Sequence, residues 1–278
     1  MSSLGRVIET TSRRRRVAGV LAALGRLGVA LALLAALVGG VGLTAVLSTP
    51  PTAPVAGPQP VQELEPAHVS PGSVAPPEQA PIPQSAPGTD PVRQWADRVS
   101  ADVDIPARAL VAYVNADLAM RQYQPGCRIS WSTLAGIGRI ESDHGRYGGA
   151  LLREDARPSR PIIGVALNGT PGVRVIGDTD GGALDGDRLY DRAVGPMQFI
   201  PSTWRNWATD GNGDGLGDPQ NLDDAAMAAA RYLCGGGRNM TTGGGWWAAV
   251  MSYNNSQEYG QKVFALAERY AAAGSRRS

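Results

Sequence analysis

The sequence predicts an α+β, mostly helical globular domain over residues 92–274, and three observations support this fold class. Apolar residues recur at helical spacing in several stretches, and capping residues, Pro or Gly mark where those stretches end. Residues 160–185 instead combine short β-branched runs with turn residues, which predicts a small hairpin or lobe. The 91 residues before the domain show neither pattern and are expected to lie outside its core.

The first 47 residues are typical of a membrane anchor. Residues 1–26 carry six arginines, and residues 27–47 carry no charge at all. As a helix, the uncharged stretch is about 31 Å long, enough to cross a hydrocarbon core of about 30 Å. The arginines favour a cytoplasmic N-terminus, so we expect a single-pass protein of the cell membrane.

Two alternatives remain for this segment. A cleaved signal peptide normally has a shorter apolar core and a small-residue cleavage site, which we do not find before the prolines begin. A basic arm that touches nucleic acid is the other. The net charge of +1 argues against nucleic acid as a partner of the whole chain.

Residues 48–91 form a Pro-rich linker, which we expect to be disordered. Residues 48–90 contain 12 of the 21 prolines, and no apolar periodicity is left from which to build a core. Such a chain favours extended polyproline II at about 3.1 Å per residue and can reach roughly 130 Å. We expect a stiff tether or a passive spacer here.

Helices in the domain are predicted from their ends and their apolar faces. Pro106 opens the first of them, Ser130 is a suitable N-cap for the second, and Gly145 ends that second helix. The predicted helices cover residues 107–123, 131–144, 201–208, 222–233, 246–253 and 257–272. The predicted hairpin joins residues 161–167 to 173–176 through the turn at 168–169.

Cys127 and Cys234 both lie in the part expected outside the membrane, where oxidising conditions let thiols pair. One disulfide is predicted. It closes a loop of about 106 residues and stabilises the fold by up to roughly 4–5 kcal/mol in the chain-entropy model. Two buried free thiols are the alternative. A zinc site is not favoured, because one of the two histidines, His68, lies in the linker.

A carboxyl group on an apolar helix face is the first sign of chemistry. Glu141 follows Leu134 by seven residues and Ile137 by four, so it shares their face of the predicted helix. Burial there raises the pKa of a carboxyl, as a general acid at neutral pH requires. The feature alone is weak, because a Glu near a helix end is more often solvated or paired.

The acidic loop at residues 210–218 matches the first half of an EF-hand. Its oxygen ligands at loop positions 1, 3, 5, 7 and 9 are Asp210, Asn212, Asp214, the Leu216 carbonyl and Asp218. Position 12 departs from the pattern, because Asn221 replaces the bidentate Glu; Asp223 or Asp224 is then the candidate last ligand. We expect structural Ca²⁺ here, with a metal-free turn as the alternative, and no organic cofactor.

Four motifs in consistent order resemble one enzyme family. They are Glu141-Ser142 after Gly-x-Gly-Arg-Ile, the segment Gly-Pro-Met-Gln-Phe-Ile-Pro-Ser-Thr-Trp at 195–204, Tyr253-Asn254, and Tyr259. Over residues 92–272 the chain resembles the lytic murein transglycosylases of the B type. The resemblance implies a lysozyme-like catalytic domain, peptidoglycan glycan strands as substrate, and a place on the cell-wall side of the membrane.

The resemblance also implies a mechanism and a set of site residues. Glu141 protonates the oxygen between N-acetylmuramic acid and N-acetylglucosamine, and the substrate N-acetyl group stabilises C1. Glu141 then takes the proton of the C6 hydroxyl, which closes a 1,6-anhydro ring. The glycan-binding residues by this resemblance are Ser142, Gln198, Tyr253, Asn254 and Tyr259. A muramidase of the same fold and an inactive wall-binding module are the competing functions.

Overall fold

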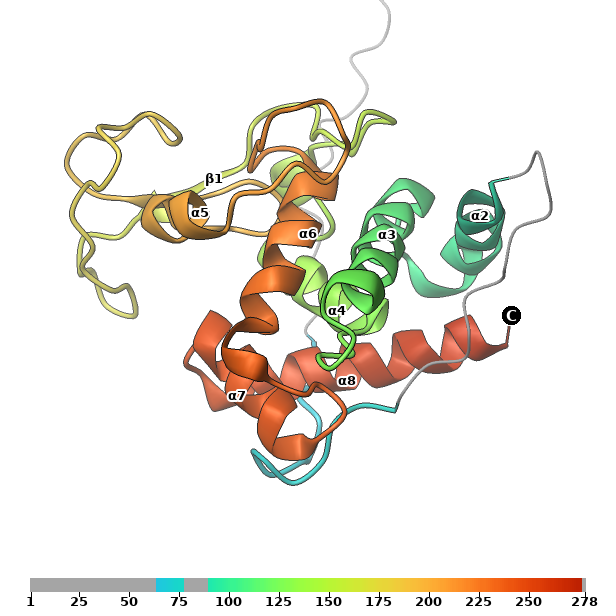
Figure 1. The fold of residues 1–278 in the computed structure, drawn as a ribbon. Helices are drawn as coiled ribbons and strands as arrows, with labels where there is room; N and C mark the ends of the chain where they lie inside the picture. Colours follow the sequence, from blue (N-terminus) through green and yellow to red (C-terminus); the bar gives the residue numbers. More distant parts are fainter. Residues whose placement is uncertain (1–63, 78–89, 277–278) are drawn as a thin grey trace, which may run out of the picture. The chain divides into compact units, whose positions relative to one another are not determined.

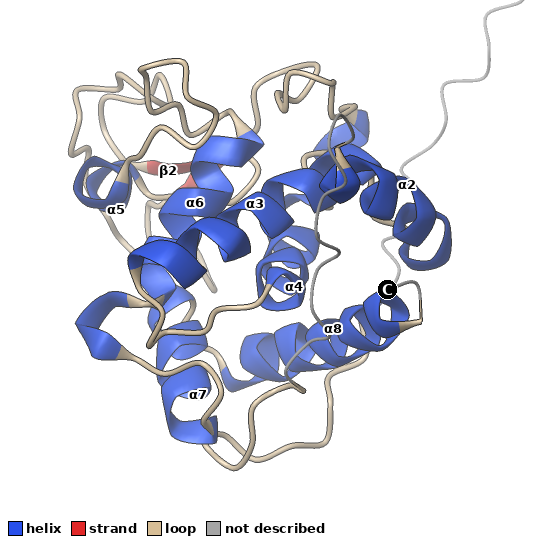
Figure 2. Ribbon diagram, turned by 45° about the vertical axis from the view of Figure 1, so that its right-hand side comes forward, coloured by secondary structure: helices blue, strands red, loops and turns tan. Residues whose placement is uncertain are grey.

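The structure is a computed structural model that describes residues 64–77 and 90–276, all within the compact unit Pro60–Ser278 (Figure 1). Most of its regular structure is helical (Figure 2), which confirms the predicted α+β, mostly helical class. The elements are α2 (Pro91–Val103), α3 (Ala107–Tyr123), α4 (Trp131–Ser142), η1 (Tyr147–Gly149), β1 (Ile163–Ala166), β2 (Arg192–Val194), α5 (Pro201–Trp207), α6 (Leu222–Leu233), η2 (Gly235–Gly237), α7 (Gly243–Tyr253) and α8 (Gln257–Ser275).

Helix α4 lies between α3 and α8 (Figures 1 and 2) and packs along α8. Gly136 permits this close approach, since a Cβ there would stand 3.1 Å from the carbonyl oxygen of Val263. On the α3 side, the buried Asp117 accepts a hydrogen bond of 3.0 Å from the backbone N–H of Trp131. A buried carboxylate needs such partners. The bond therefore holds the start of α4 in place.

The predicted helix ends agree with the structure to within a few residues. Ser130 caps α4 by accepting a hydrogen bond from the backbone N–H of Thr133. Helix α7 begins three residues before its predicted start, because Thr242 is its N-cap and accepts from the backbone N–H of Gly245. A Thr followed by three glycines gives no apolar periodicity, so the sequence pattern missed this first turn.

The predicted hairpin is only partly right. Asn168 and Val175 form an isolated bridge, but the partner of β1 is β2, in antiparallel register with Ile163 opposite Val194. The loop between them folds on its own carboxylates: one oxygen of Asp178 accepts the backbone N–H groups of residues 180, 181 and 182. The turn residues at 168–169 correctly predicted that the chain reverses its direction there. The strand partner of β1 could not be predicted in the same way, because β2 lies much further along the chain.

The predicted disulfide is present. Cys127 and Cys234 are bonded, with Cα atoms 5.5 Å apart and a separation of 107 positions in the sequence. Both are buried. The bond joins the loop before α4 to the end of α6, and the Gln124 side chain donates a hydrogen bond of 2.9 Å to the Cys234 carbonyl.

Residues 64–77 of the predicted linker lie against the domain, and we call this segment the strap. The backbone N–H of Ala67 donates to the Gln261 carbonyl at 3.1 Å, and the Trp247 indole N–H donates to the Val74 carbonyl at 3.0 Å. The expectation of disorder is therefore wrong for the strap. Four of its apolar side chains pack against the core of the domain: Leu64, Ala67, Val69 and Ala75. The burial of these side chains stabilises the ordered segment despite its proline content.

The predicted membrane span at 27–47 and the basic segment at 1–26 lie outside the described residues. Among the helices of residues 64–77 and 90–276, none is long and apolar enough to cross a membrane. The membrane topology therefore stays a prediction.

Candidate active site

The end of α4 carries the predicted acid. Glu141 is the second-last residue of this helix, which stops where Asp143 and His144 both adopt left-handed backbone angles, with φ of 51° and 58°. Their backbone N–H groups return to the carbonyls of Arg139 and Gly138 at 3.1 and 2.9 Å. Two adjacent non-glycine residues in this region are strained, so contacts elsewhere must hold the turn.

An ion-pair cluster holds this turn. Arg139 pairs with Asp143, and Arg146 pairs with Asp143 at 2.9 Å and with Asp104 at 3.1 Å. Asp104 terminates α2, so the cluster ties the end of the α4 helix to a separate helix. Because Asp104 and Asp143 are 66% and 41% exposed, each of these pairs contributes only about 0–1 kcal/mol, and it is the cluster as a whole that holds the turn.

The surroundings of Ser142 do not support its predicted role in glycan binding. Its side chain is buried, its hydroxyl donates to the Pro196 carbonyl at 2.6 Å, and it accepts the backbone N–H of Gly145 at 2.8 Å. These two bonds occupy the hydroxyl. Ser142 is therefore a structural link that holds the turn at 195–198 against the end of α4.

Glu141 has the electrostatics of a general acid. Its carboxyl group is partly buried, and burial raises the pKa of Glu141 from 4.5 to about 7. The Tyr259 hydroxyl donates a hydrogen bond of 2.6 Å to Oε1, which opposes that rise in pKa because it stabilises the carboxylate. With a pKa near neutrality, both the protonated and the ionised forms are populated, as a group that gives and then takes a proton requires.

Gln198 lies on the turn opposite the helix end. Its backbone has a positive φ of 47°, and its side-chain Nε2 donates to the Gly195 carbonyl at 2.9 Å. Two glycines make room for this turn: a Cβ on Gly195 would stand 1.7 Å from the Pro219 carbonyl oxygen, and one on Gly164 would stand 2.9 Å from Gln198 Oε1. A strained, locally locked amide of this kind is typical of a binding position.

Tyr253 supports the same turn from α7. Its hydroxyl donates to the Met197 carbonyl at 2.6 Å, and its ring meets the edge of Phe199 at 5.9 Å between centroids. Burial, and then the nearby Glu141 carboxylate, raise the pKa of the Tyr253 hydroxyl. The structure thus brings Glu141, Tyr253 and Tyr259 together, and Tyr253 contacts the turn that carries Gln198. Asn254 is the exposed C-cap of α7, and no described contact joins its side chain to that group.

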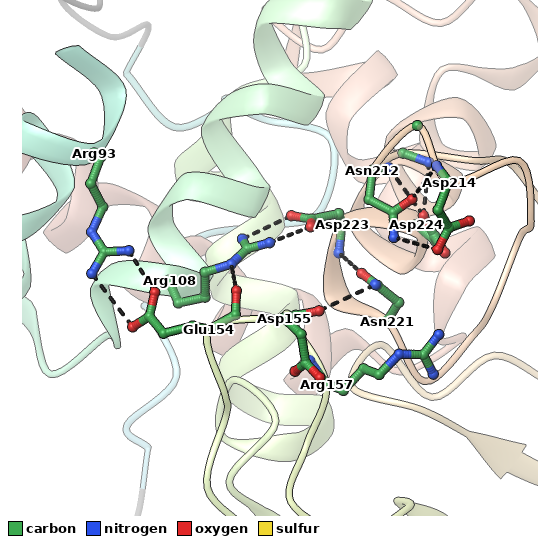
Figure 3. A network of polar contacts seen from close by, with 12 residues as sticks. Arg93, Arg108, Glu154, Asp155, Arg157, Asn212, Asp214, Asn221, Asp223 and Asp224 are labelled. Atoms are coloured by element: carbon green, nitrogen blue, oxygen red, sulfur yellow. Dashed lines mark hydrogen bonds and ion pairs between the residues drawn. The ribbon is translucent and has the colours of Figure 1, made fainter. Parts of the chain in front are cut away.

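The predicted calcium loop is folded around its own carboxylates. Asp210 accepts the backbone N–H groups of Gly213, Asp214 and Gly215. Asp224, buried at the start of α6, accepts those of Gly211 and Asp218 at 2.8 and 3.0 Å (Figure 3).

The structure also separates the two candidates for the last ligand. Asp223 is paired with Arg108 (Figure 3). Asp218 is paired with Arg157. No arginine of residues 64–77 and 90–276 pairs with Asp224, and its carboxylate turns toward the loop. Of the two, Asp224 is therefore the residue placed to close the loop.

A different set of carboxylates lies closest together among the described residues. Oxygens of Asp178, Asp180 and Asp191 all lie within 4.8 Å of one another. Asp191 is buried and bonded to both the backbone N–H and the hydroxyl of Thr179. In the sequence the acids of this Gly-rich stretch resemble solvated loop residues, so they give no sign of a site.

Residues 190–248 match the family described as the transglycosylase SLT domain. The matched segment includes Gln198, the acidic loop and most of α7. This match covers 59 of the 278 residues and agrees with the class that the motifs predict, a transglycosylase domain.

Solved structures of bacterial lytic transglycosylases are also similar to the chain. The Escherichia coli lytic transglycosylase Slt35 in complex with bulgecin A is 14% identical, with a TM-score of 0.35, 66% of this chain covered and 93% of that one. Slt35 in complex with calcium is 13% identical, with a TM-score of 0.34 and the same coverages. SltB3 from Pseudomonas aeruginosa in complex with NAG-anhNAM-pentapeptide is 18% identical, with a TM-score of 0.35 and coverages of 67% and 68%. No curated protein matches the chain.

Proposed function

We propose that the enzyme cleaves the β-1,4 bond between N-acetylmuramic acid and N-acetylglucosamine and leaves 1,6-anhydro-N-acetylmuramic ends. The observation that carries the proposal is the single carboxyl of Glu141, with a pKa of about 7 and a 2.6 Å hydrogen bond from Tyr259. Burial and Tyr259 set this pKa, and no neighbouring carboxylate contributes within the described part of the chain. A one-carboxylate site fits substrate-assisted cleavage.

The first step uses the protonated form of Glu141. Its proton goes to the glycosidic oxygen, the C1–O4 bond breaks, and the carbonyl oxygen of the substrate N-acetyl group bonds to C1. The Tyr259 hydroxyl stabilises the carboxylate that this step creates, because it donates to Oε1.

The second step uses the ionised form. The Glu141 carboxylate takes the proton of the C6 hydroxyl, and O6 bonds to C1 as the N-acetyl oxygen leaves. The ring closes, Glu141 is protonated again and no water is consumed. Tyr253 lies near this carboxyl and contacts the turn that carries Gln198, and these two residues have the phenol and amide groups that hydrogen-bond to sugar hydroxyls and acetamides.

Mass analysis of digested peptidoglycan tests the proposal. We expect muropeptides with anhydro ends from the wild-type chain and none from Glu141→Gln. Products heavier by one water identify a muramidase instead. If the wild type and Glu141→Gln both leave the glycan intact, the chain is a wall-binding module.

We also propose that the acidic loop holds structural Ca²⁺. Its oxygen donors fit a hard cation, and Asp224 supplies the acid missing at position 12. In this arrangement Asp210, Asn212, Asp214 and the Leu216 carbonyl hold the ion together with Asp224, while Asp218 also pairs with Arg157.

We further propose that the enzyme is anchored in the cell membrane. The uncharged stretch at 27–47 anchors the chain in the cell membrane, with the catalytic domain on the cell-wall side where its substrate lies. Membrane fractionation of the full chain, against a variant with two arginines placed in the stretch, tests this. Recovery of the wild type in the soluble fraction contradicts a retained anchor.

A further inference from the structure

The strap contacts both helices that frame the catalytic acid. On α8 its backbone meets Gln261 twice: the Gln261 carbonyl accepts from Ala67, and the Gln261 side chain donates to the Val69 carbonyl at 3.0 Å. On α7 the Trp247 indole donates to the Val74 carbonyl at 3.0 Å. These bonds join positions more than 170 residues apart in the chain. The strap is therefore a long-range tertiary contact of the domain.

The start of α7 is shaped to receive the strap. A Cβ on Gly243 would stand 2.5 Å from the Gly72 carbonyl oxygen and 2.7 Å from the backbone of Ser73 and Val74. A Cβ on the next residue, Gly244, would meet nothing within 4 Å. Only one of these two neighbouring glycines is therefore required for the strap to lie on the helix.

Trp247 connects the strap to the neighbourhood of Glu141. Its buried ring packs so closely on α8 that a Cβ on Gly260 would stand 2.6 Å from it. The residue before Gly260 is Tyr259, whose hydroxyl bonds to Glu141. The same helix α7 ends at Tyr253, whose hydroxyl holds the Met197 carbonyl beside Gln198.

We propose that the strap is a positioning element of the active site: by holding Trp247 against Gly260 it keeps the Tyr259 hydroxyl on Glu141. Trp247 and Gly260 are positioning residues, since they act through Tyr259 and do not touch the substrate. The inference rests on the proposed role of Glu141. It assigns to part of the linker a function in the reaction beyond that of a spacer.

Gly243→Ala in the full chain tests this, with Gly244→Ala as the matched control. Both place alanine in the first turn of α7 at an ordinary φ, but only the first collides with the strap. Hydrogen–deuterium exchange of the strap reports whether it is displaced, with the Ala67 N–H as the bonded probe. Thermal unfolding is the control that tests whether both variants are folded.

For Gly243→Ala we expect exchange in the strap to be at least about tenfold faster. We expect kcat to fall about tenfold with KM within about twofold, because a small misplacement of a catalytic group is enough for such a loss. The alkaline limb of the pH–kcat profile should move to higher pH, since the hydrogen bond from Tyr259 keeps the pKa of Glu141 down. Gly244→Ala should match the wild type in all three.

Two results overturn the inference. One is a displaced strap with kcat and pH profile equal to those of Gly244→Ala. The other is unchanged exchange in Gly243→Ala, which contradicts docking at this glycine. If Gly243→Ala does not fold, Gln261→Ala removes the bond to the Val69 carbonyl and should give the same changes, smaller in size. If the wild type leaves glycan intact, the proposed function is refuted. Hydrogen–deuterium exchange then still shows whether Gly243→Ala displaces the strap.

Discussion

Replacing Glu141 with Gln should make the folded protein more stable, and the gain should grow with pH. Burial raises the pKa of Glu141 from 4.5 to about 7 in the folded state. Between these pH values the unfolded chain releases the proton, whereas the folded chain must keep it or bury a charge. Gln has nearly the same shape, carries no charge, and can still accept the hydrogen bond from Tyr259.

The size of the gain follows from the shift. A rise of about 2.5 pH units, at 1.36 kcal/mol per unit, corresponds to roughly 3.4 kcal/mol at pH above 7. Because the carboxyl is only partly buried, solvent screening reduces this to about 2–3 kcal/mol. Below about pH 4.5 the carboxyl is protonated in both states, so the effect disappears. The gain therefore develops between about pH 4.5 and 7.

Urea unfolding of the wild type and Glu141→Gln at about pH 5 and about pH 8 measures the difference. Glu258→Gln is the control, because Glu258 is exposed and the Lys262 ammonium lowers its pKa, so its removal should give no gain. Equal effects of Glu141→Gln at both pH values, or a loss of stability at pH 8, would refute the reasoning that this carboxyl is held in a desolvated place.

Three further outcomes are expected. Tyr259→Phe removes the hydroxyl that donates to Glu141 but keeps the ring, so the pKa of Glu141 should rise. The alkaline limb of the pH–kcat profile should then move up by about one pH unit, and an unchanged limb would contradict this. Chelation of Ca²⁺ should lower the melting temperature of the wild type, and Asp224→Asn should abolish that response; equal melting temperatures with and without chelator speak against the bound ion. Cys234→Ala should reduce the free energy of unfolding by up to about 4–5 kcal/mol without moving the pH profile, as measured by urea unfolding beside reduced wild type.

Local patterns in the sequence were sufficient for the disulfide and for every described α-helix except α2, which the helical signals missed. Glu141 could be placed because helical spacing, the Gly-x-Gly-Arg-Ile run before it and the motif at 195–204 all point to one site. From the sequence, Asp224 could be named only as one of two candidate ligands. The other candidate, Asp223, is paired with Arg108 of α3, which lies 115 positions away in the sequence. Spacing in the sequence does not reveal such a partner.

The errors have a common physical cause. Ser142 was expected to bind substrate, but its hydroxyl is taken by the Pro196 carbonyl 54 positions away. The strand partner of β1 and the docking of the strap also depend on contacts between distant segments. In the strap, proline content suggested disorder, while a few apolar residues and three hydrogen bonds to the domain were enough to order it.

The strap also sets how far the enzyme can work from its proposed anchor. If all of residues 48–90 were free, the catalytic domain could sit roughly 130 Å from the membrane at about 3.1 Å per residue. With the strap docked, only residues 48–63 lie between the anchor and the domain, and their full extension is roughly 50 Å. The domain could then reach only the part of the cell wall that lies nearest to the membrane. Together with the proposed anchor at 27–47, a docked strap would confine cleavage to glycan close to the membrane.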